Sequence, residues 1–98
     1  YSTSISDERL KKDISTVTDA LSKIRQINGV EFTMKDDESR KAGVIAQEVE
    51  KVFPVAVTEK KLMNHETYKT VRYDALHALL IEAIKELADT VEKLSENK

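Results

Sequence analysis

The 98-residue sequence predicts a small α+β domain that is mostly helical, with short strands and one long C-terminal helix. Three observations predict this class. Only two glycines and one proline occur, and 35% of the residues are charged, which is typical of a helix-rich chain with few turns. Short stretches alternate apolar and polar residues, as strands do. The last third lacks glycine and proline and repeats apolar residues in heptads.

The chain is too small to build a large core. A domain of this size buries only ~60 to 65% of the surface of its unfolded chain, and there is no cysteine for a disulfide or a thiolate metal site. We therefore expect self-association. The net charge of −2 provides no basic field for nucleic acid or an anionic membrane, and no apolar run approaches the ~20 residues of a membrane span. We expect neither kind of partner.

The N-terminal third predicts an extended arm followed by a helix. Residues 1–6 are hydroxylated and β-branched, and we interpret them as the end of something upstream. Between Asp7 and Ile27 apolar residues recur every three or four positions, which predicts a helix capped at Asp13 or Ser15 and ended by Asn28-Gly29. The recurring residues are Leu10, Ile14, Val17, Leu21, Ile24 and Ile27.

The middle of the chain predicts short elements separated by polar segments. Alternation of apolar and polar residues indicates strands, and Pro54 stops a helix that precedes it. The predicted segments are a half-buried strand over Gly29–Lys35, a charged exposed loop over Asp36–Lys41, a short strand over Gly43–Ile45, a helix over Ala46–Phe53, and an antiparallel hairpin of Val55–Thr58 with Tyr68–Arg72.

The segment from Tyr73 to about Ser95 predicts a long helix with a heptad seam. A second, overlapping apolar register that includes Leu76 and Ala83 widens the apolar face, as expected when more than two helices share one axis. We expect a trimeric coiled coil; the alternative is a single helix that lies on its own domain. The seam consists of Tyr73, His77, Leu80, Ile84, Leu87, Val91 and Leu94.

The two histidines do not indicate a metal site or a cofactor. Neither His65 nor His77 has the spacing of a metal-binding motif around it, and the two glycines are too far apart for a phosphate-binding loop. We expect His77 to pack near the seam and His65 to be solvated in a polar loop. The sequence therefore predicts no metal and no cofactor.

One constellation permits chemistry, the run from Ser6 to Lys12. A serine hydroxyl attacks an acyl carbon when a base takes its proton, and a lysine is such a base only when neutral, which burial or cationic neighbours such as Arg9 and Lys12 favour. Lys11 comes within reach of Ser6 if the chain turns between them. The same residues are equally consistent with a helix start that Ser6 caps, with Arg9 and Lys11 exposed.

Four blocks in order resemble one family. They are SDERLKKDI (residues 6–14), ALSKIRQINGVEF (20–32), GVIAQEVEKVFP (43–54) and YKTVRYDALHALLIEAIKEL (68–87). Together they resemble the intramolecular chaperone auto-processing domain at the C-terminus of phage tailspikes, tail fibres and endosialidases. Related domains occur in some cellular proteins, so the resemblance favours a phage source without requiring one.

The resemblance implies a single-turnover serine peptidase that acts on its own chain. Ser6 would be the nucleophile, Lys11 its base, and the bond between Ile5 and Ser6 the cleavage site, with Asp7 and Arg9 as positioning residues. A finished product would begin at Ser6. Because residues 1–5 precede an intact Ser6 and Lys11, we interpret this chain as an uncleaved precursor.

The resemblance also implies the partners. Residues 1–5 would be a remnant of the upstream fibre, 6–72 the chaperone body and 73–98 the trimerisation helix of a homotrimer that registers the β-rich fibre of the same polypeptide. This would happen in the host cytoplasm during virion assembly, before release from the fibre. We further expect the polar segments 36–41 and 60–67 to contact the upstream chains; the alternative is that both are ordinary solvated loops. Two alternatives remain: a trimerisation module that stays attached, and a cellular coiled-coil adaptor that forms a dimer or hetero-oligomer.

Overall fold

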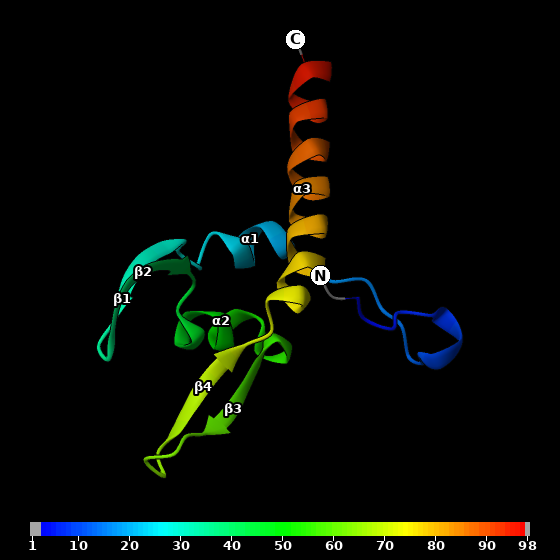
Figure 1. The fold of residues 1–98 in the computed structure, drawn as a ribbon. Helices are drawn as coiled ribbons and strands as arrows, with labels where there is room; N and C mark the ends of the chain where they lie inside the picture. The colour runs from blue at the N-terminus through cyan, green and yellow to red at the C-terminus, as the bar shows by residue number, and fades with distance from the viewer. Residues whose placement is uncertain (1–2, 98) are drawn as a thin grey trace.

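The computed structural model describes residues 3–97 as an α+β fold around one long helix (Figure 1). The predicted fold class is confirmed, whereas residues 1, 2 and 98 of the predicted arm and last helix lie outside the described part. In chain order the elements are η1 (Glu8–Leu10), α1 (Ala20–Ile24), β1 (Val30–Met34), β2 (Asp37–Gly43), α2 (Ala46–Val52), η2 (Pro54–Ala56), β3 (Val57–Lys61), β4 (Thr67–Val71) and α3 (Tyr73–Glu96).

The predicted helix between Asp7 and Ile27 is wrong for most of its length. Only η1 and α1 are helical, and residues 11–19 run as irregular chain between them. Asp13 and Asp19 have φ angles of 54° and 53°, which a right-handed helix excludes. The β-branched residues in segment 14–18 further lower its helix propensity. Asp19, rather than Asp13 or Ser15, precedes α1.

The strands form two separate antiparallel hairpins, β1 with β2 and β3 with β4. The predicted charged loop over Asp36–Lys41 is wrong, because β2 occupies Asp37–Gly43 and pairs with β1. Its charged side chains are exposed, so the backbone ladder forms without burying charge. The predicted strand over Gly43–Ile45 is also wrong, since β2 ends at Gly43. The second hairpin and α2 lie where the sequence predicts them; the bounds of the strands shift by one to three residues, and α2 begins at Ala46 as predicted and ends one residue earlier.

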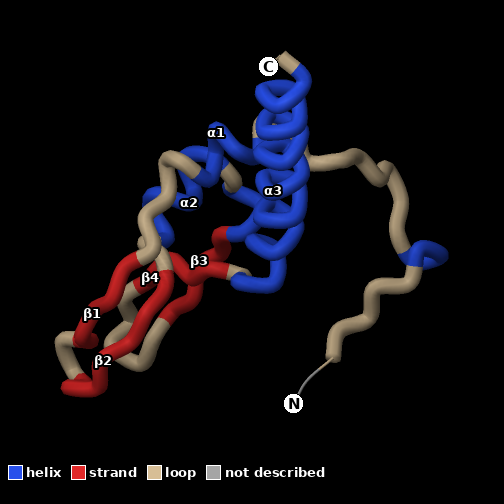
Figure 2. The backbone as a smooth tube through the Cα atoms, turned by 90° about the horizontal axis from the view of Figure 1, so that it is seen from above, coloured by secondary structure: helices blue, strands red, loops and turns tan. Residues whose placement is uncertain are grey.

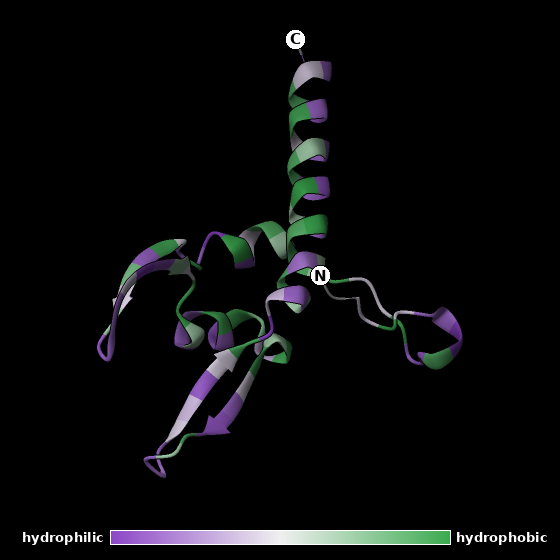
Figure 3. Cartoon of the chain, viewed as in Figure 1, coloured by the Kyte–Doolittle hydropathy of each residue, from purple (hydrophilic) through white to green (hydrophobic). Residues whose placement is uncertain are grey.

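A small core lies where α1, α2 and η2 meet the first turns of α3. Leu79 of α3 and Val49 of α2 are the largest fully buried side chains, and burial stabilises such residues by ~1.5–3 kcal/mol each. Figure 3 shows apolar residues along these contacting faces. The core consists of Ala20, Val49, Phe53, Ala56, Leu76, Leu79 and Ala83.

The long helix α3 has two apolar faces with different surroundings. Leu76, Leu79 and Ala83 face the core of the same chain. The helix then continues beyond the rest of the fold (Figure 1), and at 1.5 Å per residue its 24 residues span about 36 Å. None of the helices within residues 3–97 combines the length and apolar character needed to cross a bilayer.

Candidate functional site

The Ser6 segment lies on an arm that stands away from the rest of the chain. Residues 3–16 leave α3 on the side opposite the hairpins and extend outward in both views (Figures 1 and 2). Their side chains are exposed, including the apolar ones: Ile5 is 85% exposed, Leu10 74% and Ile14 66%. The arm therefore makes little use of the core of its own chain.

A single helical turn, η1, shapes the arm. Asp7 precedes the turn, and its Oδ1 accepts a hydrogen bond from the Arg9 backbone N–H at 2.9 Å. The Leu10 N–H donates to the Asp7 carbonyl at 3.1 Å, and the Lys11 N–H donates to the Glu8 carbonyl at 3.0 Å. The sequence forms this turn because aspartate is a preferred residue at a helix N-cap.

The turn brings Ser6 and Lys11 together. Lys11 Nζ donates a hydrogen bond to Ser6 Oγ at 2.7 Å, across five residues of chain. Both side chains are exposed. A hydroxyl and an amine at this distance have the geometry required of a serine nucleophile and a lysine base. Ile5, on the other side of the expected cleavage site, is adjacent in sequence and exposed.

Asp7 and Arg9 form an ion pair beside this contact. The Arg9 guanidinium donates to Asp7 Oδ1 from Nε at 3.1 Å and to Oδ2 from Nη2 at 2.9 Å. These side-chain bonds, followed by the backbone bond from Arg9, lower the pKa of Asp7, and the same pairing raises the pKa of Arg9. The predicted cap is wrong, because Asp7 rather than Ser6 caps the turn. Arg9, which the sequence offered as a cationic neighbour of Lys11, is paired with Asp7.

The predicted seam residues occupy one exposed face of α3. Leu80 is 43% exposed, Leu87 49% and Ile84 64%, and the apolar stripe is visible along the helix in Figure 3. His77 is exposed on the same helix, and His65 is exposed in the turn between β3 and β4 with a φ of 66°. Tyr73, Val91 and Leu94 are likewise exposed. Within residues 3–97, no three His, Asp or Glu side chains are grouped as metal ligands.

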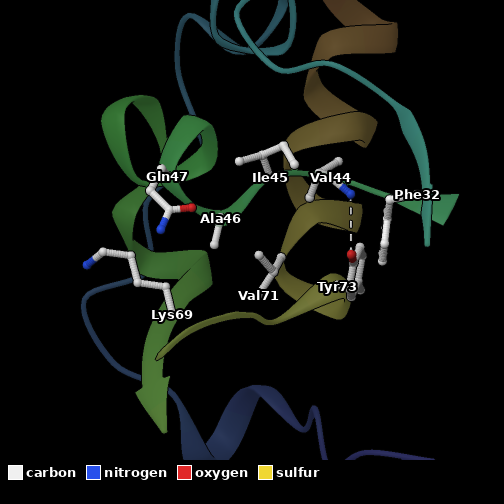
Figure 4. A pocket seen from close by; sticks show the side chains of 8 residues that line it. All are labelled: Phe32, Val44, Ile45, Ala46, Gln47, Lys69, Val71 and Tyr73. Atoms are coloured by element: carbon white, nitrogen blue, oxygen red, sulfur yellow. Dashed lines mark hydrogen bonds between the residues drawn. The ribbon is translucent and has the colours of Figure 1, made fainter. Parts of the chain in front are cut away.

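The hairpins, α2 and α3 line a shallow depression of about 270 Å³, and no residue of the Ser6 turn is among its lining residues (Figure 4). Tyr73 forms one wall, and its hydroxyl accepts a hydrogen bond from the Val44 N–H at 3.3 Å. A Cβ at Gly43 would collide with that hydroxyl, so glycine permits the close approach. The remaining lining residues are Phe32, Ile45, Ala46, Gln47, Lys69 and Val71.

Sequence reasoning missed two carboxylates that join distant segments. Glu86 of α3 accepts hydrogen bonds from the N–H groups of Ala20 and Leu21 at 2.8 and 3.0 Å, and so caps α1. Glu48 of α2 accepts from the Asn28 N–H at 3.0 Å. The partners are 20 to 66 residues away along the chain, so no local spacing identifies them.

Comparison with known proteins gives two kinds of match. Residues 6–58 match the family Peptidase_S74, described as chaperone of endosialidase. The chain is also 35% identical over 94 residues to a long tail fiber protein, Gp37, of Enterobacteria phage K3 and to its counterpart in Enterobacteria phage T2. Each alignment covers 91% of this chain but only 8% and 7% of the relatives. The chain thus spans less than a tenth of the length of these curated relatives.

Proposed function

Because this chain belongs to the chaperone of endosialidase family, we propose that it is an assembly chaperone for a phage tail fibre that trimerises, registers the fibre and then releases itself. The contact between Lys11 Nζ and Ser6 Oγ at 2.7 Å carries the proposal of self-release. The match to two long tail fiber proteins supports the kind of client that we propose, an upstream β-rich fibre of the same polypeptide. Assembly would take place in the host cytoplasm, before the virion matures.

The proposed reaction is an acyl shift followed by hydrolysis. Lys11, in its neutral form, takes the proton of Ser6 Oγ, and the oxygen attacks the Ile5 carbonyl carbon. The bond from that carbon to the Ser6 nitrogen breaks, the nitrogen receives the proton, and an ester joins Ile5 to Ser6. Water then hydrolyses the ester to a carboxylate on Ile5 and restores the hydroxyl. The catalyst acts once, on its own chain.

In this reaction the hydrogen bond between Ser6 and Lys11 reverses its direction. In the single chain the amine donates to the hydroxyl, whereas a base must accept the hydroxyl proton. Burial favours the neutral lysine, and both side chains are exposed in the single chain. The exposed apolar side chains of the arm, Ile5, Leu10 and Ile14, favour a second copy as the source of that burial. Cleavage would then follow association.

The trimer is proposed from the exposed seam of α3. Seven seam residues stay exposed although α3 already packs its other face on the core, and three helices around one axis would bury them. Long interwoven β-structure pairs slowly and aggregates easily. If a helical tag joins the three chains before the fibre forms, it raises the effective concentration of the upstream strands.

We also propose contacts between this domain and the upstream chains. They would involve β2 and the tip of the β3–β4 hairpin, where Met63 is 98% exposed.

Mass spectrometry of the purified chain over time tests self-release. Wild type should lose residues 1–5 by cleavage after Ile5, whereas Ser6→Ala and Lys11→Ala should stay intact. Thr3→Ala, which changes another exposed hydroxyl of the arm, is the control and should cleave like wild type. If both Ser6→Ala and Lys11→Ala cleave at the wild-type rate, the serine–lysine assignment is wrong.

Light scattering tests the trimer separately. Three chains of 11.1 kDa give about 33 kDa, and Leu87→Asp on the seam should shift this mass toward 11.1 kDa. Lys93→Asp adds the same carboxylate at an exposed position off the seam and should leave the trimer intact. A wild-type mass of about 22 kDa would favour a dimeric adaptor. A stable trimer that never cleaves would favour the module that stays attached.

A further inference from the structure

One side chain closes the turn that joins the two proposed reactive residues. Ser6 precedes Asp7 and Lys11 follows η1, and the Asp7 carboxylate caps this turn at the Arg9 N–H, at 2.9 Å. We infer that Asp7 is a positioning residue for self-cleavage, which holds the Lys11 amine at the Ser6 hydroxyl by capping the turn. The inference rests on the function proposed above. It assigns to Asp7 the geometry of the contact between Ser6 and Lys11.

The cap matters because little else holds the arm in shape. Five residues of extended chain span about 17 Å, whereas a 3₁₀ turn advances only about 2 Å per residue and lets the Lys11 side chain fold back. Among residues 3–12, every recorded hydrogen bond joins groups at most five residues apart. The arm side chains are exposed, so packing does not fix the turn. Without the cap, the Arg9 N–H would bind water, and only the two backbone bonds from the Leu10 and Lys11 N–H groups would oppose opening of the turn.

Asp7 makes two kinds of contact, and each predicts a different effect of Asp7 substitutions on the cleavage rate. The cap needs only a side-chain oxygen, and asparagine caps about as well as aspartate. The ion pair with Arg9 needs the charge, but the two side chains are 43% and 88% exposed, so water and salt screen it. The cap is therefore the contact that positions Lys11. Asparagine at this position should work, and alanine should not.

Three variants of the 98-residue chain separate the two contacts. Asp7→Ala should slow the loss of residues 1–5 about fivefold, the change that corresponds to a missing N-cap. Asp7→Asn keeps the cap and should stay within about twofold of wild type. Arg9→Ala removes the exposed ion pair but keeps the Arg9 N–H, so it should cleave faster than Asp7→Ala. The rates of Asp7→Ala and Asp7→Asn should differ by the same factor at every pH, because both variants lack the carboxylate charge and they differ in the cap.

Two outcomes would overturn the inference. If Asp7→Ala cleaves at the wild-type rate, the cap does not position Lys11. If Asp7→Asn is as slow as Asp7→Ala at every pH, the charge and not the cap is required. Failure of the proposed function looks different, because wild type and Ser6→Ala would then behave alike, either both intact or both cleaved at the same rate.

A measurement that does not depend on cleavage uses Leu87→Asp as the background, because this variant keeps both Ser6 and Lys11 while copies of the chain stay apart. In nuclear magnetic resonance spectra, the Lys11 ε-methylene should show an Overhauser contact to the β-carbon protons of residue 6. The contact should persist when Asp7→Asn is added and disappear when Asp7→Ala is added, together with the protection of the Arg9 N–H. Persistence of the contact in the alanine variant would also overturn the inference, whether or not wild type cleaves.

Discussion

The N-terminal arm and the packed body of this chain are held by different kinds of interaction. The body joins distant segments: Leu79 of α3 is buried against α1 and α2, and Glu86 binds backbone groups 65 and 66 residues away. The recorded hydrogen bonds of residues 3–12 span at most five residues. The geometry at Ser6 can therefore form without the body. Substitutions should affect stability in the body and reactivity in the arm.

The largest expected effect on stability is at Leu79, which is fully buried. Leu79→Ala removes packing atoms and leaves a cavity among the core residues, so the free energy of unfolding should fall by about 2–5 kcal/mol. Urea unfolding followed by circular dichroism measures the loss. The Arg9 N–H signal under native conditions should remain where it is in wild type. A loss below about 1 kcal/mol would mean that the core repacks around the alanine.

The next largest effect is expected where the first hairpin meets α3. Gly43→Ala places a methyl group against the Tyr73 hydroxyl, and such overpacking should cost about 1–3 kcal/mol. Tyr73→Phe removes the colliding oxygen and leaves the ring carbon at 3.4 Å and Phe32 at 3.6 Å from the new methyl group, ordinary contact distances. The double variant should therefore be more stable than the sum of the two single losses predicts. Strict additivity would show that the hydroxyl is not the obstacle.

A smaller, pH-dependent effect is expected at Glu86. Hydrogen bonds from the N–H groups of Leu21 and then Ala20 lower the pKa of this carboxyl below its ordinary 4.5. Its stabilisation is therefore fully present above pH 4.5 and is lost as the pH falls through the lower folded value. Unfolding midpoints measured from pH 7 downward should fall less steeply in Glu86→Gln than in wild type. Equal slopes would exclude Glu86 as the source.

Sequence patterns predicted the segments whose neighbours along the chain set their structure. The helix from Tyr73 and the β3–β4 hairpin show the expected periods. The five-residue spacing of Ser6 and Lys11 permitted their contact, but the resemblance of the SDERLKKDI block was needed to predict the pair. The helix predicted after Asp7 failed because a three-to-four residue apolar spacing also describes an irregular segment, 11–19, in which Val17 packs on the core. The left-handed backbone of Asp13 has no signal in that pattern.

Local sequence patterns could not predict the long-range polar contacts, because such contacts depend on which segments the fold brings together. Glu86 lies among other charged residues of α3, and its spacing in the sequence is that of an ordinary solvated face. Only the fold places α1 beside it. The Asp7 cap is a local contact by comparison, because its partner is only two residues away along the chain. The sequence showed a helix start at this point but left Ser6 as the capping residue, since serine and aspartate cap about equally well.

The smallest expected effect repeats the Leu79 substitution in the arm. Leu10 is 74% exposed in the single chain, so Leu10→Ala should change the free energy of unfolding by at most about 0.5 kcal/mol. Dilute samples in the Leu87→Asp background, where copies are kept apart, should give this value. If other copies bury the arm, Leu10→Ala should cost more in the associated wild-type chain, and increasingly so as the protein concentration rises. An equal, small cost at every concentration would mean that the arm stays solvated in the assembly and that Lys11 must become neutral by another route.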